Sequence, residues 1–204
     1  MALAKSLYSV HPGVQRTRIW VETLKEKTGR SLDEWVRFVK KSAPAGEKER
    51  KEWLRKEHGF AMYTAGWIVD RAAGRGEDMD SPEAYLESAT RYVEQLYAGK
   101  AALRPVYDAL LRLGMGLGKD VKACPCQTMV PLYRKHVFAQ IKPTTRTRID
   151  LGLALGARAA EGSLIDTGGY AKKDRITHRI PVSSVAEITD EVQKWLRTAY
   201  EEDR

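Results

Sequence analysis

The spacing of apolar residues along this chain changes near residue 121. Before that point apolar residues recur every three or four positions, as on one face of a helix, and after it they recur at every second position. Alternation by two places apolar side chains on one face of a strand and polar side chains on the other. The alternating residues are Val130, Leu132, Val137, Ala139, Ile141, Ile149, Leu151, Leu153 and Leu155. The change predicts an α+β fold, in which helices precede an antiparallel sheet domain that is itself flanked by helices.

Four helices are predicted in the first 75 residues. The first ends at Gly29, since glycine readily adopts the left-handed conformation of a helix C-cap. The second begins at Ser31, three residues before Glu34, which is the spacing of a capping box. Residues 47–58 and 61–73 form the third and fourth helices. Together these helices predict a small all-α module.

A linker is predicted after this module. The stretch "AAGRGEDMDSPEAY" has the Gly, Asp and Ser-Pro content of a loop, and Pro82 suits the first position of a helix. We therefore expect a helical module of residues 1–77 and an α+β domain of residues 78–204. Helices are expected over residues 82–97 and 101–113, and a last helix is expected to begin at the capping box of Ser184 and Glu187.

The segment "VPLYRKHVFAQIKPTTRTRID" predicts a hairpin whose two-residue turn is Arg134 and Lys135. In that register Tyr133 pairs with His136, and the apolar face of the two strands belongs to the core. The opposite face then carries Tyr133, His136, Phe138, Gln140 and Lys142, with Arg148 and Asp150 as neighbours on the next strand.

Basic charge is concentrated in this half of the chain. The whole sequence has a formal net charge of +8, and residues 119–179 hold 12 Lys and Arg against 5 Asp and Glu, a net +7. Residues 180–204 hold 3 against 6, a net −3. A cationic sheet beside neutral or acidic helices favours an anionic partner such as nucleic acid.

Aromatic and cationic residues share the predicted outer face. Proteins that bind single-stranded nucleic acid stack bases on aromatic rings and neutralise phosphates with Lys and Arg. The candidate residues are Tyr133, His136, Phe138, Lys142, Arg146 and Arg148. The alternative is that a helix covers Tyr133 and Phe138 and leaves only the cations exposed.

A second candidate is the loop and strand "TGGYAKKDRITHR". Its glycines could let backbone amides point at a phosphate or carboxylate, while its cations add charge. The candidate residues are Lys172, Lys173, Arg175, His178 and Arg179. The alternative is a solvated basic loop, because the stretch matches neither a P-loop nor a dinucleotide fingerprint.

Cys124 and Cys126, together with His136 and His178, are of the residue types that bind zinc. Structural zinc sites usually separate paired cysteines by two to four residues, whereas one residue separates these two, and the sequence has no second pair. The sequence therefore predicts neither a metal nor a cofactor. The cysteines are interpreted as small apolar residues at a strand edge.

No nucleophile elbow, His-Glu-x-x-His motif or Gly-rich nucleotide motif occurs, which favours a non-enzymatic binding protein. The alternative is a protein-interaction or small-anion module, with a pocket between sheet and helices lined by Tyr133, Phe138 and Arg148. An enzyme is the third possibility. No apolar run approaches the ~20 residues of a membrane span, so a cytoplasmic protein without a membrane partner is expected.

Several stretches resemble two catalogued families. "SVHPGV", "LKEKTGRSLDEWVRFVKK" and "EKERKEWLRKEHGF" resemble domain of unknown function 4287. "AALRPVYDALL", "LYRKHVFAQIKPTTRTRIDLGLAL", "DRITHRIPVSS" and "WLRTAY" resemble domain of unknown function 5655. The resemblance implies a two-module chain and carries no established activity, so function must be argued from the site.

Overall fold

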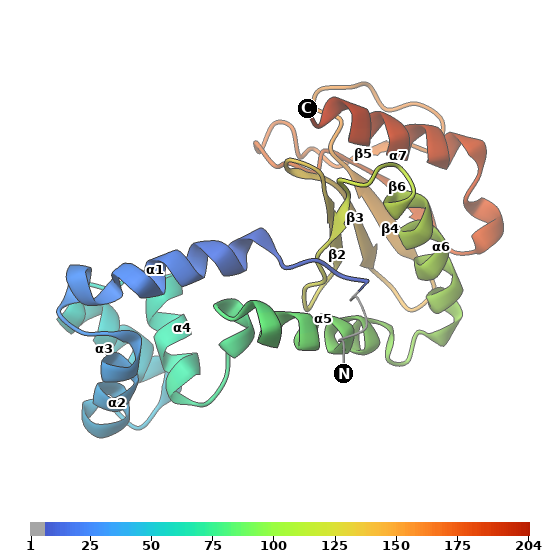
Figure 1. Cartoon of the computed structure of the whole chain (residues 1–204). Coiled ribbons are helices and arrows are strands. Elements are labelled where there is room, and N and C mark those ends of the chain that lie inside the picture. The colour runs from blue at the N-terminus through green and yellow to red at the C-terminus, as the bar shows by residue number, and fades with distance from the viewer. Residues whose placement is uncertain (1–6) are drawn as a thin grey trace. The chain divides into compact units, whose positions relative to one another are not determined.

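The computed structural model describes residues 7–204, and Figure 1 shows the course of the chain. The chain divides into two compact units: residues 10–86, and residues 7–9 together with 87–204. The division falls inside helix α5 (Pro82–Tyr97). The boundary predicted at residue 77 lies earlier, at the 3-10 helix η1 (Glu77–Met79).

The first unit contains the four predicted helices, α1 (Pro12–Thr28), α2 (Leu32–Ser42), α3 (Glu47–His58) and α4 (Met62–Ala72). Gly29 ends α1 with a φ of 79°. The capping box is confirmed, because the Ser31 amide donates to the Glu34 carboxylate at 2.6 Å and the Glu34 amide donates to the Ser31 hydroxyl at 3.3 Å. The core of this unit is built from Leu24, Trp35, Val39, Leu54, Ala65 and Ile68.

The second unit is an antiparallel sheet with helices before and after it, which confirms the α+β prediction. Its helical elements are the remainder of α5, η2 (Ala101–Leu103), α6 (Arg104–Met115), η3 (Val185–Glu187) and α7 (Asp190–Glu202). Its strands are β1 (Lys122–Ala123), β2 (Val130–Tyr133), β3 (Val137–Pro143), β4 (Ile149–Leu153), β5 (Ile165–Asp166) and β6 (His178–Val182). The strand order is β1-β2-β3-β4-β6-β5, so β1 and β5 form the two edges of the sheet.

Helices α6 and α7 contact each other and lie over the same face of the sheet (Figure 1). The approach is close at Gly114 of α6, where a Cβ atom would lie 2.4 Å from Cδ1 of Leu132. The inner face is fully buried at Leu132, Ala139, Ile141, Leu151, Leu153 and Val182. On the outer face Gln140, Asp150 and Arg179 are partly exposed and Lys142 is exposed.

The register of the first hairpin differs from the prediction. Leu132 pairs with Ala139, but Tyr133 pairs with Val137, so the ladder contains a β-bulge and the turn has three residues rather than two. One extra residue reverses the alternation of faces. As a result the consecutive residues Phe138 and Ala139 are both fully buried, and Val137 is only half-buried.

The predicted start of the last helix is also wrong. Ser184 precedes the 3-10 turn η3 and Glu187 is its last residue, whereas α7 begins at Asp190 after Thr189. The Glu187 carboxylate accepts the amide of Ser183 at 2.9 Å and the hydroxyl of Ser184 at 3.1 Å, so it closes a turn rather than capping a helix.

Candidate functional site

Two kinds of cation line the basic half of the second unit. Five arginines of residues 119–179 lie within 4.0 Å of a carboxylate: Arg134, Arg148, Arg158, Arg175 and Arg179. Within residues 7–204, the other cations of this stretch have no such partner: Lys119, Lys122, Lys135, Lys142, Arg146, Lys172 and Lys173. The arginines therefore serve the fold, while the unpaired cations, almost all lysines, remain open to an anion.

Asp150 illustrates how the sheet holds its arginines. Its side chain is only 15% exposed, and its Oδ1 lies 2.9 Å from Nε of Arg148 and 3.2 Å from an Nη atom of Arg179. Asp150 also pairs across the strands with Lys142. One carboxylate thus serves two guanidinium groups, and the outer face keeps a net positive charge.

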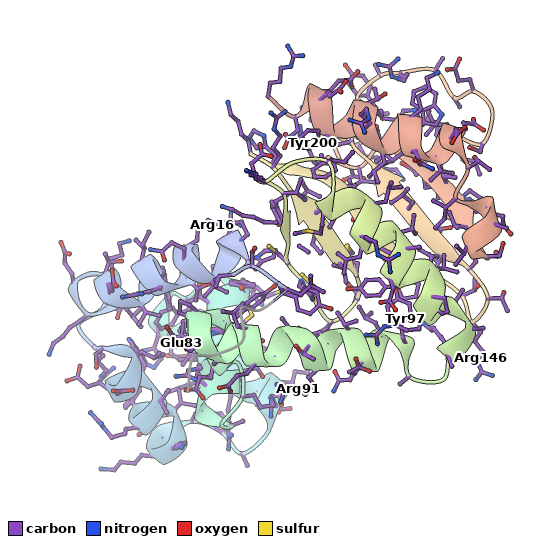
Figure 2. The ribbon with its side chains drawn as sticks, turned by 45° about the vertical axis from the view of Figure 1, so that its right-hand side comes forward. Arg16, Glu83, Arg91, Tyr97, Arg146 and Tyr200 are labelled. Carbon is purple, nitrogen blue, oxygen red and sulfur yellow. The ribbon has the colours of Figure 1, made fainter. Side chains whose placement is uncertain are left out.

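Arg146 lies at the turn between β3 and β4. Figure 2 shows its side chain pointing away from the sheet. The turn is closed by the amide of Thr145, which donates to the carbonyl of Arg148 at 3.2 Å. Because Arg146 is exposed and Lys142 is exposed near the end of β3, this end of the outer face carries two unpaired cations.

The basic loop, residues 167–175, does not offer the amides of its two glycines to an anion. The amide of Gly168 donates to the side chain of Asp166 at 2.7 Å and that of Gly169 to the hydroxyl of Thr167 at 3.2 Å. The amides of residues 172 and 174 both donate to the carbonyl of Gly169. The prediction that glycine amides bind an anion here is wrong, because these donors close the loop on itself.

The same loop exposes an aromatic ring. Tyr170 is 60% exposed and lines a depression of about 700 Å³ together with Lys173 and Arg175. Tyr170 was absent from the sequence-based candidates, although its place between "TGG" and "AKKDR" combines an aromatic residue with cations on a loop. The loop therefore presents an aromatic ring beside cations at the surface.

Asp174 and Arg175 also line a second depression. The second depression is about 460 Å³ and is lined by Val137, Gln140, Thr167, Asp174, Arg175 and Ile176. The Nε of Arg175 donates to the carbonyl of Val137 at 3.0 Å, and an Nη atom pairs with Asp203. These contacts fix the guanidinium between the loop and the start of β3.

Two predicted candidates lie in the core instead of on the surface. Phe138 is fully buried and its ring packs edge-on against Tyr200 of α7, with 5.6 Å between centroids. His178 is 1% exposed, and its ring nitrogens contact the hydroxyl of Thr177 at 2.8 Å and the carbonyl of Arg158 at 2.9 Å. Neither residue can contact a ligand on the outer face.

The remaining candidates are distributed around the sheet. Tyr133 is half-buried, and the ring of His136 is exposed. Lys142, Arg146 and Arg148 lie at the other end of β3, because Pro143 pairs with Ile149 there. Tyr133 and Phe138 therefore do not line one pocket with Arg148, since about 23 Å of strand β3 separates the two ends.

The cysteines are not poised for thiolate chemistry. Burial raises the pKa of the Cys124 thiol to about 12 and also raises the pKa of Cys126. Over residues 7–204, no three His, Cys, Asp or Glu side chains gather closely enough to hold a metal ion. In that same part of the chain, no helix is long and apolar enough to cross a membrane.

The fold and the surface define a class of protein, namely an α+β domain whose two helices cover one face of an antiparallel sheet. Residues 93–203 match the model of domain of unknown function DUF5655, which covers more than half of the chain, and the protein belongs to that family. Residues 18–72 match domain of unknown function DUF4287, which gives the two-module arrangement. No curated protein and no solved structure matches the chain.

Proposed function

We propose that this protein binds single-stranded nucleic acid along the outer face of the sheet of its second unit. The observation that carries the proposal is that exposed Tyr170 and unpaired Lys173 line one of two adjoining depressions on a face that α6 and α7 leave uncovered. Aromatic rings stack bases of any sequence, and lysines neutralise phosphates as point charges.

The unpaired cations lie at both ends of β3. Lys172 and Lys173 belong to the loop that Arg175 ties to Val137 at the start of the strand, and Lys142 and Arg146 lie at or beyond its end. Seven strand residues extend about 23 Å, which is long enough for several nucleotides of an extended strand. A polyanion therefore fits this arrangement better than a single small anion does.

A single strand is favoured over a duplex by the position of the aromatic group. Stacking on Tyr170 requires an unpaired base with an accessible face, and bases inside a duplex offer none. Within the second unit, α6 and α7 lie over the opposite face of the sheet, so neither helix is placed on the outer face to enter a major groove.

The test is a fluorescence anisotropy titration of the full chain with a labelled single strand and with its duplex, at several salt concentrations. The logarithm of the binding constant for the single strand should fall linearly with the logarithm of the salt concentration. The reason is that lysine and arginine side chains displace the counterions bound to the phosphates. Lys142→Glu should weaken binding, whereas Arg197→Glu, on α7 over the opposite face, should not.

Equal affinity of both variants, or binding without salt dependence, would contradict the proposal. A thermal-shift screen separates the main rival, because a small anion that stabilises the protein while no nucleic acid binds would indicate a small-anion site.

A further inference from the structure

One residue in the basic loop has an unusual backbone conformation. Over residues 7–204, Lys173 is the only residue other than glycine with a positive φ, which is 60°. Residues other than Gly, Asn and Asp adopt this left-handed backbone conformation at a cost in free energy, because Cβ crowds the following carbonyl. Such strain is retained where the surrounding structure imposes it, and it concentrates at functional sites.

The loop imposes this conformation through its own hydrogen bonds. The amide of Lys173 donates to the carbonyl of Tyr170 at 3.0 Å, and the next amide, of Asp174, donates to the carbonyl of Gly169 at 2.8 Å. Gly169 packs closely against the neighbouring backbone, since a Cβ atom there would lie 2.4 Å from the carbonyl oxygen of Ile176. These backbone hydrogen bonds hold the conformation of the loop. They do not involve the side chain at position 173, so they do not require a lysine there.

Lys173 forms no ion pair that would offset the strain. No carboxylate lies within 4.0 Å of its ammonium group among the residues described. Lys173 lines the 700 Å³ depression with exposed Tyr170 and with Arg175, whereas the neighbouring Lys172 does not line it. Lys172 also has an ordinary backbone conformation. The two lysines are thus equal in charge and different in placement.

We infer that Tyr170 and Lys173 form a subsite for one nucleotide unit, in which the base stacks on Tyr170 and the phosphate contacts Lys173. The inference rests on the proposed nucleic-acid binding and names the residues that determine it. A rigid loop lowers the conformational entropy that is lost on binding. The cost of the left-handed backbone at Lys173 is therefore offset, because the ammonium group is already positioned before the ligand binds.

The experiment compares the full chain with Lys173→Ala, Lys173→Gly and Lys172→Ala in single-strand affinity and in melting temperature. Both variants of Lys173 should lose roughly tenfold in affinity, because a charge-assisted contact to phosphate is removed. Lys172→Ala should lose less than about threefold, because only a screened long-range charge is removed. Lys173→Gly should melt roughly 2 °C above Lys173→Ala, because glycine tolerates the left-handed conformation and alanine does not.

Tyr170 supplies the second arm of the experiment. Tyr170→Phe keeps the ring and should bind within about twofold of the parent chain, whereas Tyr170→Ala should lose roughly tenfold in affinity. A folded Tyr170→Ala variant is expected, because the side chain is 60% exposed.

The possible failures are distinguishable. If the parent chain binds single strands and the variants of Lys172 and Lys173 lose the same affinity, the subsite is wrong and the broader binding surface stands. If Tyr170→Ala binds as the parent chain does, the subsite is also wrong. If the parent chain binds no single strand at any salt concentration, the proposed function fails and the subsite fails with it.

Discussion

Asp203 holds His136 by two hydrogen bonds. Its Oδ2 accepts the backbone amide of His136 at 2.8 Å and its Oδ1 lies 3.0 Å from the ring Nδ1. Arg175 pairs with the same carboxylate, whose side chain is 1% exposed. One buried group after α7 therefore ties together the β2–β3 turn and the loop that precedes β6.

Replacing Asp203 with Ala should lower the free energy of unfolding by about 3 kcal/mol, because the buried carboxylate that contacts the amide and ring of His136 and the guanidinium of Arg175 is removed. Urea denaturation measures the change. Glu202→Ala is the matched control, since Glu202 pairs with Arg158 at the surface with both side chains about 40% exposed, and it should cost less than about 1 kcal/mol. Equal losses for the two variants would show that Asp203 is not a special contact.

Phe138→Ala should cost about 3–5 kcal/mol of unfolding free energy, because a fully buried ring that packs against Tyr200 is replaced by a cavity. Val137→Ala is the control one residue away, and because Val137 is half-buried the loss should be about 1 kcal/mol. Urea denaturation again gives the values. The reverse order would indicate that the alternation follows the predicted register without the bulge.

The native thiols should resist alkylation. With a pKa of about 12, the thiolate fraction of Cys124 at pH 8 is about one in 10⁴, and the side chain is fully buried. Iodoacetamide treatment followed by mass spectrometry should therefore find Cys124 unmodified in the native protein and alkylated in denaturant. Rapid alkylation of native Cys124 would mean that the segment opens readily.

Asp120 should make stability depend on acid pH. A hydrogen bond from Arg134, followed by one from Tyr200, lowers the pKa of its carboxyl below the ordinary value of 3.8. A lowered folded-state pKa adds stability that is present above the unfolded value and is lost as pH falls through the folded value. The melting temperature of Asp120→Asn should therefore lie below that of the parent chain near neutral pH.

The difference in melting temperature between the two proteins should shrink as the pH falls below about 4. The carboxylate of the parent chain then becomes protonated, and so neutral like the amide that replaces it in the variant. Curves that remain equally separated into this acid range would mean that the charge of Asp120 contributes nothing.

The helices and the α+β class were readable from the sequence, because they depend on local signals. The capping box of Ser31 and Glu34 and the left-handed stop at Gly29 are satisfied within one turn of chain, and the structure contains both. The same pattern at Ser184 and Glu187 forms a 3-10 turn instead. The motif specifies a hydrogen-bonded turn, and whether a helix continues from it depends on the residues that follow.

The candidate surface was readable only in part. Lys142, Arg146, Lys172 and Lys173 are exposed as their charge predicts. Phe138 and His178 are buried, because one extra residue in the β2–β3 ladder and the position of β6 against the loop at Arg158 decide which way these rings face. Tyr170 is a candidate because it is exposed and lines a depression with Lys173 and Arg175. The spacing of residues along the chain predicts neither property.

The sequence by itself determined the two modules, the period of each segment and the excess of basic charge in residues 119–179, since these depend on residue type and short-range spacing. Only the tertiary structure decided which cations are free. Some arginines pair with carboxylates distant in the chain, as Arg175 does with Asp203 and Arg158 with Glu202, whereas the lysines of residues 119–179 have no carboxylate within 4.0 Å among the described residues. Ion pairing over such separations depends on how the strands and α7 pack. A count of charged residues therefore gives the total number of cations, but not which of them form ion pairs and which remain exposed without a partner.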